Sequence, residues 1–181
     1  MAHVTFVLGG ARSGKSARAL ALAEAAAPRR VFVATAEALD AEMADRIARH
    51  KAERGPDWAL EEAPLDLSAS VAAHGHPGAV LLIDCLTLWL SNLMHRERDV
   101  DAETAALIEV LESASGHVVL VSNEVGMGLA PMNALGRAFR DAQGRLNQRI
   151  AAAANRVEFV VAGLPIVLKG GGTGERAGRD V

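Results

Sequence analysis

The chain has 181 residues, of which 50% are hydrophobic and 23% charged, so it is long enough for one α/β domain and does not have the composition of a disordered chain. Its formal net charge of -3 gives no general attraction to nucleic acid or to an anionic membrane, and we expect neither as a partner. No apolar run approaches the roughly 20 residues of a membrane-spanning helix, and the first residues lack the pattern of an export signal, so we expect a cytoplasmic protein.

Short β-branched runs alternate along the chain with longer alanine-rich ones. The short runs predict parallel strands buried on both faces, at residues 4–8, 31–35, 80–84, 118–122 and 157–162. Helical patterns lie between them, at residues 15–27, 40–54, 87–95, 102–113 and 133–155. This alternation predicts an α/β fold with a mainly parallel sheet flanked by helices.

We expect a single domain over residues 1–169 and a flexible C-terminal tail over residues 170–181, which is rich in glycine and polar residues. The only cysteine, Cys85, lies in an apolar run, so we expect a buried, inert thiol and no intramolecular disulfide. In the last predicted helix, the apolar residues at three- and four-residue spacing predict one packed face, made of Leu135, Phe139, Ala142, Leu146 and Ile150.

A glycine-rich segment directly after the first predicted strand has the spacing G-x-x-x-x-G-K-[ST]. Its glycines let backbone N–H groups turn toward one anion, and the following helix directs its N-terminal N–H groups at the same point. Lys15 would neutralise the β and γ phosphates, and Ser16 would offer an oxygen to Mg²⁺. We therefore predict that a nucleoside triphosphate binds Gly9, Gly10, Ala11, Arg12, Ser13, Gly14, Lys15 and Ser16.

A magnesium ion bound by Ser16 is expected to have a second protein ligand, a carboxylate from a neighbouring strand. Asp84 follows four apolar residues at the carboxyl end of a predicted strand, the edge at which open parallel sheets bind ligands. The alternative is that Asp84 caps the helix that begins near Leu86.

The segment 40–54 reads as a helix with acids in its first turn and bases in its last. Such charges complement the helix dipole and need no ligand to explain them. The spacing alone therefore favours the interpretation of His50 as a solvated surface residue. The functional alternative is that the basic cluster gathers a triphosphate while the neutral imidazole of His50 attacks phosphorus. Spacing does not decide between the two.

Several motifs together resemble one family, the bifunctional adenosylcobinamide kinase / adenosylcobinamide-phosphate guanylyltransferases of cobalamin biosynthesis. The resemblance extends over the chain up to Lys169, and its most specific parts are SNEVG and RDxxGRLNQ in this order. It is carried by residues 9–16, 33–36, 40–43, 46–47, 50–51, 58, 61–62, 82–89, 91–93, 122–126, 136–141 and 144–148.

The resemblance implies a RecA-like P-loop fold in a homotrimer, with Mg²⁺ and with GTP and ATP as substrates. The first reaction would phosphorylate the primary hydroxyl of adenosylcobinamide from ATP or GTP. In the second, a histidine would attack the α-phosphorus of GTP, release pyrophosphate and carry GMP to adenosylcobinamide phosphate, giving adenosylcobinamide-GDP. The family's histidine lies in a His-Lys motif after the second strand, so the resemblance assigns this role to His50. Lys15 is the second residue that we predict to be catalytic, from its place in the phosphate loop.

The resemblance also implies that the guanine nucleotide is contacted by Ala34, Thr35, Ala36, Lys51, Ala52, Glu53, Arg54 and Glu62. Glu62 could accept two hydrogen bonds from guanine, or could be a solvated strand residue. Glu124 could be a base for the cobinamide hydroxyl or could orient a metal ligand. Trp58 and Trp89 fit packing better than a platform for the corrin ring.

Two other classes of protein remain in view. One is a plain P-loop small-molecule kinase or NTPase without guanylyl transfer, in which His50 has no role in nucleotide chemistry. The other is a nucleotide-gated binding module, which would bind without turnover. The 3% aromatic content and the near-neutral charge argue against a nucleic-acid filament.

Overall fold

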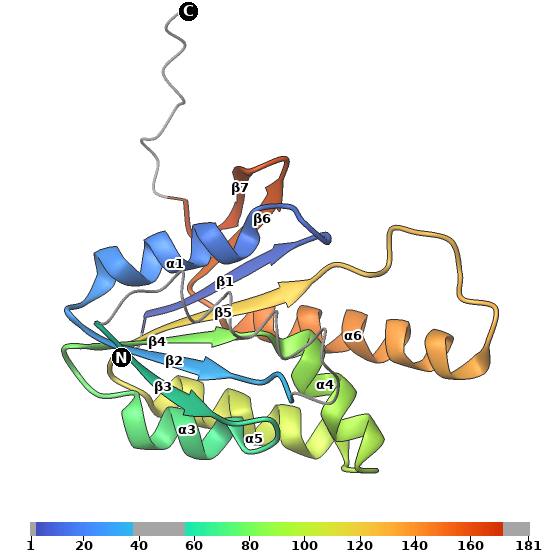
Figure 1. The fold of residues 1–181 in the computed structure, drawn as a ribbon, viewed down its shortest axis with the longest axis horizontal. Helices are drawn as coiled ribbons and strands as arrows, with labels where there is room; N and C mark the ends of the chain where they lie inside the picture. The colour runs from blue at the N-terminus through green and yellow to red at the C-terminus, as the bar shows by residue number, and fades with distance from the viewer. Residues whose placement is uncertain (1–2, 38–56, 172–181) are drawn as a thin grey trace, which may run out of the picture.

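The structure, a computed structural model, describes residues 3–37 and 57–171 (Figure 1). Seven strands form one sheet in the order β3-β2-β4-β5-β1-β6-β7. The strands are β1 (His3–Gly9), β2 (Arg29–Ala34), β3 (Trp58–Glu62), β4 (Ala79–Asp84), β5 (His117–Asn123), β6 (Arg156–Val161) and β7 (Leu164–Lys169). All neighbouring pairs are parallel except β6 and β7, so the predicted mainly parallel α/β fold is confirmed.

Helices cover both faces of the sheet (Figure 1). The described helices are α1 (Lys15–Ala26), α3 (Leu67–His74), α4 (Leu86–His95), α5 (Val100–Ser113) and α6 (Ala134–Ala153). One buried cluster joins α1 to residues of the sheet, among them Val7, Phe32 and Val121. A second, larger cluster joins α3, α4, α5 and α6 to the opposite face. None of these helices is long and apolar enough to cross a membrane.

All five predicted strands form, with ends shifted by at most two residues. Of the predicted helices, four form, and the one at 40–54 lies outside the described residues. Three elements were not predicted: β3, α3 and the antiparallel β7. The strand predicted over 157–162 ends at Val161, because Ala162 and Gly163 both have positive φ and make the tight turn into β7.

The prediction of the packed face of α6 is wrong for Leu135, the first of its five residues. Leu135 is 67% exposed, one residue into the helix. From Ala142 onward α6 buries a face that includes two amides, Gln143 and Asn147. Periodicity of apolar residues misses these amides, because they are buried for their hydrogen bonds rather than for their hydrophobicity.

The buried amides of α6 connect the helix to the end of β5. Gln143 Nε2 donates to Ser122 Oγ at 3.0 Å and to Asn147 Oδ1 at 2.9 Å. Ser122 Oγ in turn donates to Asn147 Oδ1 at 2.8 Å, and Asn147 Nδ2 donates to the carbonyl of Asn123 at 3.1 Å. These bonds fix the carboxyl end of β5, where the chain leaves toward Glu124.

A buried ion pair anchors α1 to the sheet. Glu158 of β6 has no exposed surface, and its carboxylate accepts two hydrogen bonds from Arg18 of α1, at 2.8 and 2.9 Å. Arg156 Nε donates to the same carboxylate at 2.8 Å. The hydrogen bonds from Arg18 and Arg156 outweigh burial and lower the pKa of Glu158.

We expect Glu158→Ala to lower the free energy of unfolding by about 2–3 kcal/mol at pH 7, since it leaves two partly buried arginines without their carboxylate. Because the folded-state pKa is lowered, the stabilisation is present above the ordinary glutamate pKa and is lost as pH falls from there through the lowered value. Urea unfolding at pH 7 and between pH 5 and 3 measures both effects. The exposed Glu112→Ala is the control, and an equal loss in the two variants at pH 7 would contradict the anchoring role.

Candidate functional site

The phosphate loop lies between β1 and α1, where the sequence predicts it (Figure 1). Gly14 precedes α1 in a left-handed conformation with φ 93°, and no side chain caps the first N–H groups of the helix. Inside the loop, the N–H of Ser13 donates to the carbonyl of Gly10. Uncapped N–H groups at a helix start, next to a lysine, form a site for an anion.

Lys15 is buried, although it carries a charge. Its Nζ donates to the carbonyl of Gly10 at 3.1 Å, so the side chain folds back over the loop that precedes it. A buried ammonium is costly unless it is paired or hydrogen-bonded. Its position over the loop places the positive charge where a bound phosphate would lie.

Two glycines of the loop are required by close contacts. A Cβ at Gly9 would lie 2.5 Å from Ser13 Oγ and 2.7 Å from the carbonyl oxygen of Val160. A Cβ at Gly14 would lie 3.1 Å from the Cα of Gly163, in addition to the strain of its positive φ. The loop is therefore packed tightly between its own helix and the turn that joins β6 to β7.

Ser16 and Asp84 are both half-buried, and neither side chain has a hydrogen bond or ion pair with another described residue. The N-cap position of α4 is occupied by Cys85 and has no side-chain cap, so the alternative of Asp84 as a helix cap does not hold. A hydroxyl and a carboxylate are oxygen ligands of the kind that Mg²⁺ prefers. The two residues therefore fit a magnesium ion bound together with phosphates and water.

Glu62, Ala34 and Asp84 lie in one row across three neighbouring strands. Ala34 pairs with Glu62 on one side and with Asp84 on the other. Residues two positions earlier in β2 and β4, Phe32 and Leu82, belong to the cluster that packs on α1. Because side chains alternate along a strand, the three residues share the α1 face at the carboxyl end of the sheet.

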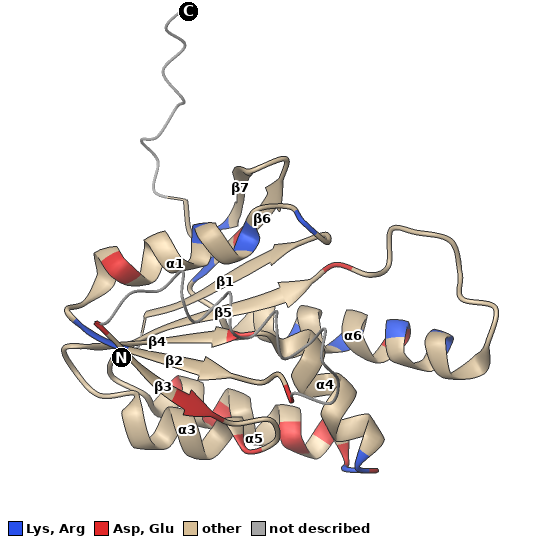
Figure 2. Cartoon of the chain, viewed as in Figure 1, with Lys and Arg blue, Asp and Glu red and all other residues tan. Residues whose placement is uncertain are grey.

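The neighbouring acid, Glu61, faces the other way. Its carboxylate accepts a hydrogen bond from Ser70 Oγ at 2.6 Å and lies 2.5 Å from His74 Nε2, both on α3. Figure 2 shows the acidic residues of β3 in red, on the strand at the edge of the sheet. Glu61 therefore holds α3, and Glu62 is exposed on the opposite face.

Thr35 has no exposed surface and joins the ends of β2 and β4. Its hydroxyl donates to the carbonyl of Cys85 at 2.7 Å and accepts from the N–H of Cys85 at 2.8 Å. The amide of Asn92 donates to the carbonyl of Thr35 at 2.8 Å. The side chain thus holds Ala34 and Asp84 in place, and its predicted contact with a nucleotide stays a prediction, as does that of the half-buried Ala36.

Glu124 follows β5, beside the start of the phosphate loop. Its N–H donates to the carbonyl of Gly9 at 3.0 Å, and its Oε1 accepts from the N–H of Gly126 at 2.6 Å. The backbone of Glu124 is thus bound to the start of the loop, and one of its carboxylate oxygens is engaged by Gly126, which leaves both of its predicted roles open.

Both tryptophans pack in the protein. Trp89 has no exposed surface, and its indole N–H donates to the carbonyl of Leu65 at 2.6 Å. Trp58 packs edge-on against Phe32, with ring centroids 6.4 Å apart. The interpretation as a packing residue is confirmed for Trp89, and for the half-buried Trp58 it stays a prediction.

The thiol of Cys85 is buried between β4 and α4, as expected. Burial, with a further contribution from the charge of Asp84, raises the pKa of Cys85 to about 11.

We expect the folded protein to react with a thiol-specific maleimide at pH 8 about 100-fold more slowly than the unfolded chain, since almost none of the thiol is ionised and little of it is accessible. Mass spectrometry of samples quenched over time, with and without guanidinium, measures both rates. Equal rates would mean that the segment around Cys85 opens readily.

His50 and residues 51–54 lie outside the described residues, so their assigned roles stay predictions. Within the described part of the chain, the structure brings Gly9 to Ser16, Ala34, Glu62 and Asp84 to the carboxyl end of the sheet. That part contains no group of three or more His, Cys, Asp or Glu side chains that could hold a metal ion on their own.

A sequence profile of the family "Cobinamide kinase / cobinamide phosphate guanyltransferase" matches residues 5–168. The chain belongs to this family. It is 46% identical to the bifunctional adenosylcobalamin biosynthesis protein CobP of Pseudomonas aeruginosa, over 91% of this chain and 96% of the relative. It is 41% identical to the protein CobU of Salmonella typhimurium, over 90% of this chain and 98% of the relative.

Among solved structures, the P4 protein from bacteriophage phi6, in complex with ADP, superposes with a TM-score of 0.44 at 16% identity, covering 91% of this chain and 54% of that one. Membership of the family makes the chain an enzyme of cobalamin biosynthesis, a transferase with a phosphate loop.

Proposed function

We propose that the chain first phosphorylates adenosylcobinamide and then transfers GMP from GTP to adenosylcobinamide phosphate, giving adenosylcobinamide-GDP. The observation that carries this proposal is the phosphate loop with its buried Lys15, at the same carboxyl end of the sheet as the row of Glu62, Ala34 and Asp84. In this row, the carboxylate of Asp84 would bind a metal ion and that of Glu62 would bind the guanine base. Both lie on the face of the sheet that α1 covers. The identity of 46% and 41% to bifunctional relatives supports both reactions.

In the first reaction, the hydroxyl of the aminopropanol arm attacks the γ-phosphorus of ATP or GTP. An oxygen–phosphorus bond forms, the bond to the oxygen between β and γ phosphorus breaks, and the nucleoside diphosphate leaves. Lys15 and the N–H groups at the start of α1 hold the phosphates and stabilise the charge that develops on them. Glu124, whose backbone N–H is bound to Gly9 at the start of the loop, is a candidate acceptor for the hydroxyl proton.

In the second reaction, a nitrogen of His50 attacks the α-phosphorus of GTP. The new phosphorus–nitrogen bond replaces the bond to the leaving pyrophosphate, and His50 carries GMP. An oxygen of adenosylcobinamide phosphate then attacks the same phosphorus and releases the histidine. The basic residues Lys51 and Arg54 follow His50 in the sequence and would stabilise the departing polyanion.

Ser16 and Asp84 are the residues that would hold Mg²⁺. The ion would neutralise charge on the phosphates and orient them. Glu62 would accept hydrogen bonds from guanine N1 and N2, which adenine lacks, and residues 34–36 and 51–54 would complete the nucleotide site. We also propose that the enzyme is a homotrimer of the cytoplasm, where GTP and ATP are available.

The test is product analysis with purified protein, Mg²⁺ and adenosylcobinamide. With ATP labelled at the γ-phosphorus, label should move to the corrinoid. With GTP labelled at the α-phosphorus, label should appear in a second corrinoid product only when phosphorylated corrinoid is present. Nucleotide hydrolysis without labelled corrinoid would overturn the proposal, and transfer of the γ-label alone would reduce it to a plain kinase.

A further inference from the structure

A buried asparagine of α4 joins the carboxyl ends of two strands. Asn92 is 8% exposed, and its side-chain amide donates to the carbonyl of Thr35 at 2.8 Å and to the carbonyl of Pro64 at 3.0 Å. Thr35 directly follows β2, and Pro64 follows β3, two residues after Glu62. Both hydrogens of one amide group are thus donated to the strand ends that carry Ala34 and Glu62.

The same helix begins beside the carboxylate that is proposed to bind Mg²⁺. α4 starts at Leu86, two residues after Asp84, and the hydroxyl of Thr35 bonds to both backbone groups of Cys85, which lies between them. Asn92 lies about two turns further along α4. One helix therefore connects the metal ligand of the proposed site to the strand end that carries its guanine ligand.

β3 depends on this support because it is the edge strand of the sheet. Among the described strands it pairs with β2 alone, and most of its residues are exposed. Beyond Glu62 the pairing continues with one bond, from the N–H of Ala63 to the carbonyl of Ala34 at 2.9 Å. The bond from Asn92 to Pro64 comes directly after it, so it fixes the exit of β3 relative to β2.

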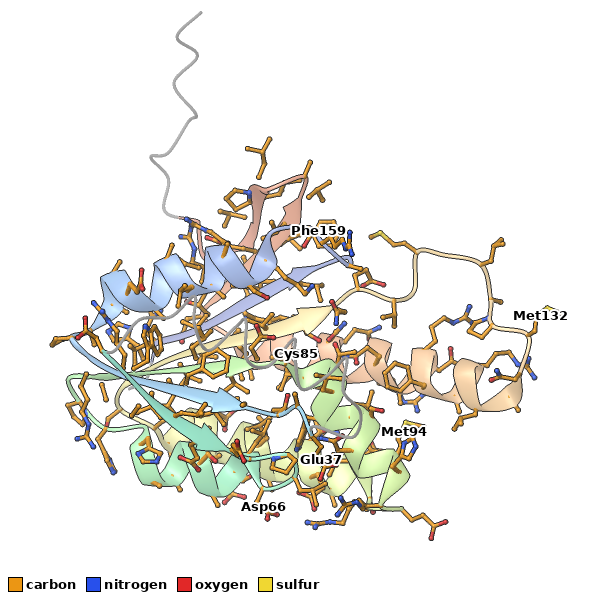
Figure 3. The ribbon with its side chains drawn as sticks, viewed as in Figure 1. Glu37, Asp66, Cys85, Met94, Met132 and Phe159 are labelled. Atoms are coloured by element: carbon orange, nitrogen blue, oxygen red, sulfur yellow. The ribbon has the colours of Figure 1, made fainter. Side chains whose placement is uncertain are left out.

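Two ion pairs also join the end of α4 and the residues after it to these segments. Arg96 pairs with Glu37 at 2.8 Å, and Arg98 pairs with Asp66 at 3.7 Å. Figure 3 labels Glu37 and Asp66. Both pairs lie at the surface, where water screens the charges and such pairs contribute little. Asn92, in contrast, bonds to both segments at once and does so from the interior.

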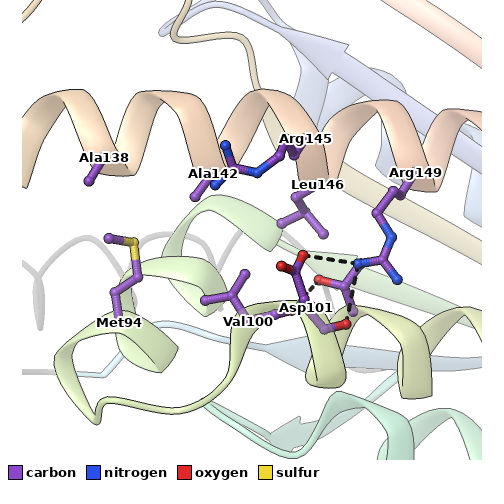
Figure 4. Close-up of a pocket in the computed structure, with 9 residues that line it drawn as sticks. Met94, Val100, Asp101, Ala138, Ala142, Arg145, Leu146 and Arg149 are labelled. Carbon is purple, nitrogen blue, oxygen red and sulfur yellow. Dashed lines mark hydrogen bonds and ion pairs between the residues drawn. The ribbon is translucent and has the colours of Figure 1, made fainter.

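The side of α4 that faces α6 is packed less completely. Met94 borders a cavity of about 220 Å³ together with residues of α5 and α6, shown in Figure 4, and also borders a second cavity of about 300 Å³. A helix that adjoins empty space is held less firmly by packing on that side. The hydrogen bonds of Asn92 therefore carry more of the connection between α4 and the sheet.

We infer that Asn92 is a positioning residue that sets where Glu62 lies relative to Asp84, and that it thereby favours guanine over adenine nucleotides. The inference rests on the proposed contact of Glu62 with guanine. Asp84 ends β4, which is paired on both sides, so it stays in place when β3 shifts. A displaced β3 then weakens the contact with guanine, whereas ATP makes no such contact and keeps its affinity.

The two acceptors of Asn92 make its amide group specific. Both are carbonyl oxygens, so the NH₂ group and not the oxygen of the amide faces them. Asn92→Asp keeps the shape of the side chain but turns a carboxylate toward two carbonyls. Asn92→Leu keeps a similar size without a charge. The two variants share the loss of the N–H groups, so an effect common to both reports the hydrogen bonds.

The first test measures the binding of GTP and of ATP by competition with a fluorescent nucleotide in the presence of Mg²⁺. Asn92→Leu and Asn92→Asp should each raise the Kd of GTP about 10-fold and leave that of ATP within about twofold. The control is Thr104→Val, which removes the hydrogen bond of a buried side chain within α5 and should leave the ratio of the two constants unchanged.

Circular dichroism checks that the variants fold, and if one Asn92 variant does not, the other decides. An equal change for GTP and ATP would mean a general loss of structure and would overturn the inference. Unchanged binding of GTP, or an effect in only one of two folded Asn92 variants, would overturn it as well.

The second test asks whether Asn92 acts through Glu62. Glu62→Gln should raise the Kd of GTP, and adding Asn92→Leu to it should raise that constant by less than about a further twofold. Effects that multiply would show that Asn92 acts by another route and would overturn the inference alone. If Glu62→Gln leaves GTP binding unchanged, the proposed guanine contact fails and the inference fails with it. Neither measurement depends on phosphoryl or guanylyl transfer.

Discussion

Replacing His50 by alanine is expected to abolish guanylylation while leaving phosphorylation of adenosylcobinamide within about twofold of the wild type. The reason is that His50 forms the bond to the α-phosphorus in the proposed second reaction only. With GTP labelled at the α-phosphorus, wild-type protein should carry label through denaturing electrophoresis, labile to acid and stable to base, as a phosphorus–nitrogen bond is. The variant should carry none.

His95→Ala is the matched control, because it removes an exposed imidazole, in the last turn of α4, that has no part in the proposed reactions. It should label like the wild type. If the His50→Ala protein became labelled, the nucleophile would be another residue. An unlabelled wild type with intact phosphoryl transfer would leave the plain kinase as the better description.

Lys15→Ala is expected to lower kcat/KM for phosphorylation about 100- to 1000-fold, and to weaken nucleotide binding as well. The variant loses the only buried lysine side chain of the described chain, which lies over the phosphate loop. Kinetics with ATP and with GTP, together with titration of a fluorescent nucleotide, separate the effect on binding from that on turnover.

Arg29→Ala provides the control for Lys15, since it removes an exposed cation from the amino end of β2, at the opposite edge of the sheet. It should leave both constants unchanged. If Lys15→Ala kept more than a tenth of wild-type activity, the phosphates would have to be held by other groups. A loss of thermal stability larger than that of Arg29→Ala would indicate a folding defect instead.

The strands that carry the phosphate loop and Asp84 could be predicted because each is a short, largely apolar run next to a motif residue. Residues 4–8 and 80–83 contain no charged side chain, as expected for strands buried on both faces. The phosphate loop was predictable for a related reason, since its glycines and its lysine are demanded by local geometry. Local sequence patterns were therefore enough to predict the phosphate loop and the strand that ends at Asp84.

The elements that the sequence did not reveal lie at the edges of the sheet or are short. β3 has only Trp58 and Glu61 partly buried, and β7 has every residue exposed, so neither has the buried pattern of a central strand. α3 has eight residues and almost no amphipathic character. Their formation depends on pairing with a neighbour or on packing, which a single sequence does not display.

The row of Glu62, Ala34 and Asp84 could not be predicted from spacing, because it depends on the order of the strands. β2 lies between β3 and β4 in the sheet, although β3 lies between them in the chain. Only this order brings the two carboxylates to either side of Ala34. The resemblance to the family indicated Glu62 and Asp84 separately, without relating one to the other.

The two adjacent glutamates of β3 have different surroundings because successive side chains of a strand point to opposite faces of the sheet. Glu61 is bound to Ser70 of α3, and Glu62 lies on the face of the sheet that α1 covers. Deleting one residue between Trp58 and Leu60 would exchange the two, since a shift of one residue turns every side chain of a strand to the other face. A length change in this strand would thus preserve charge while removing the carboxylate of Glu62 from the nucleotide face.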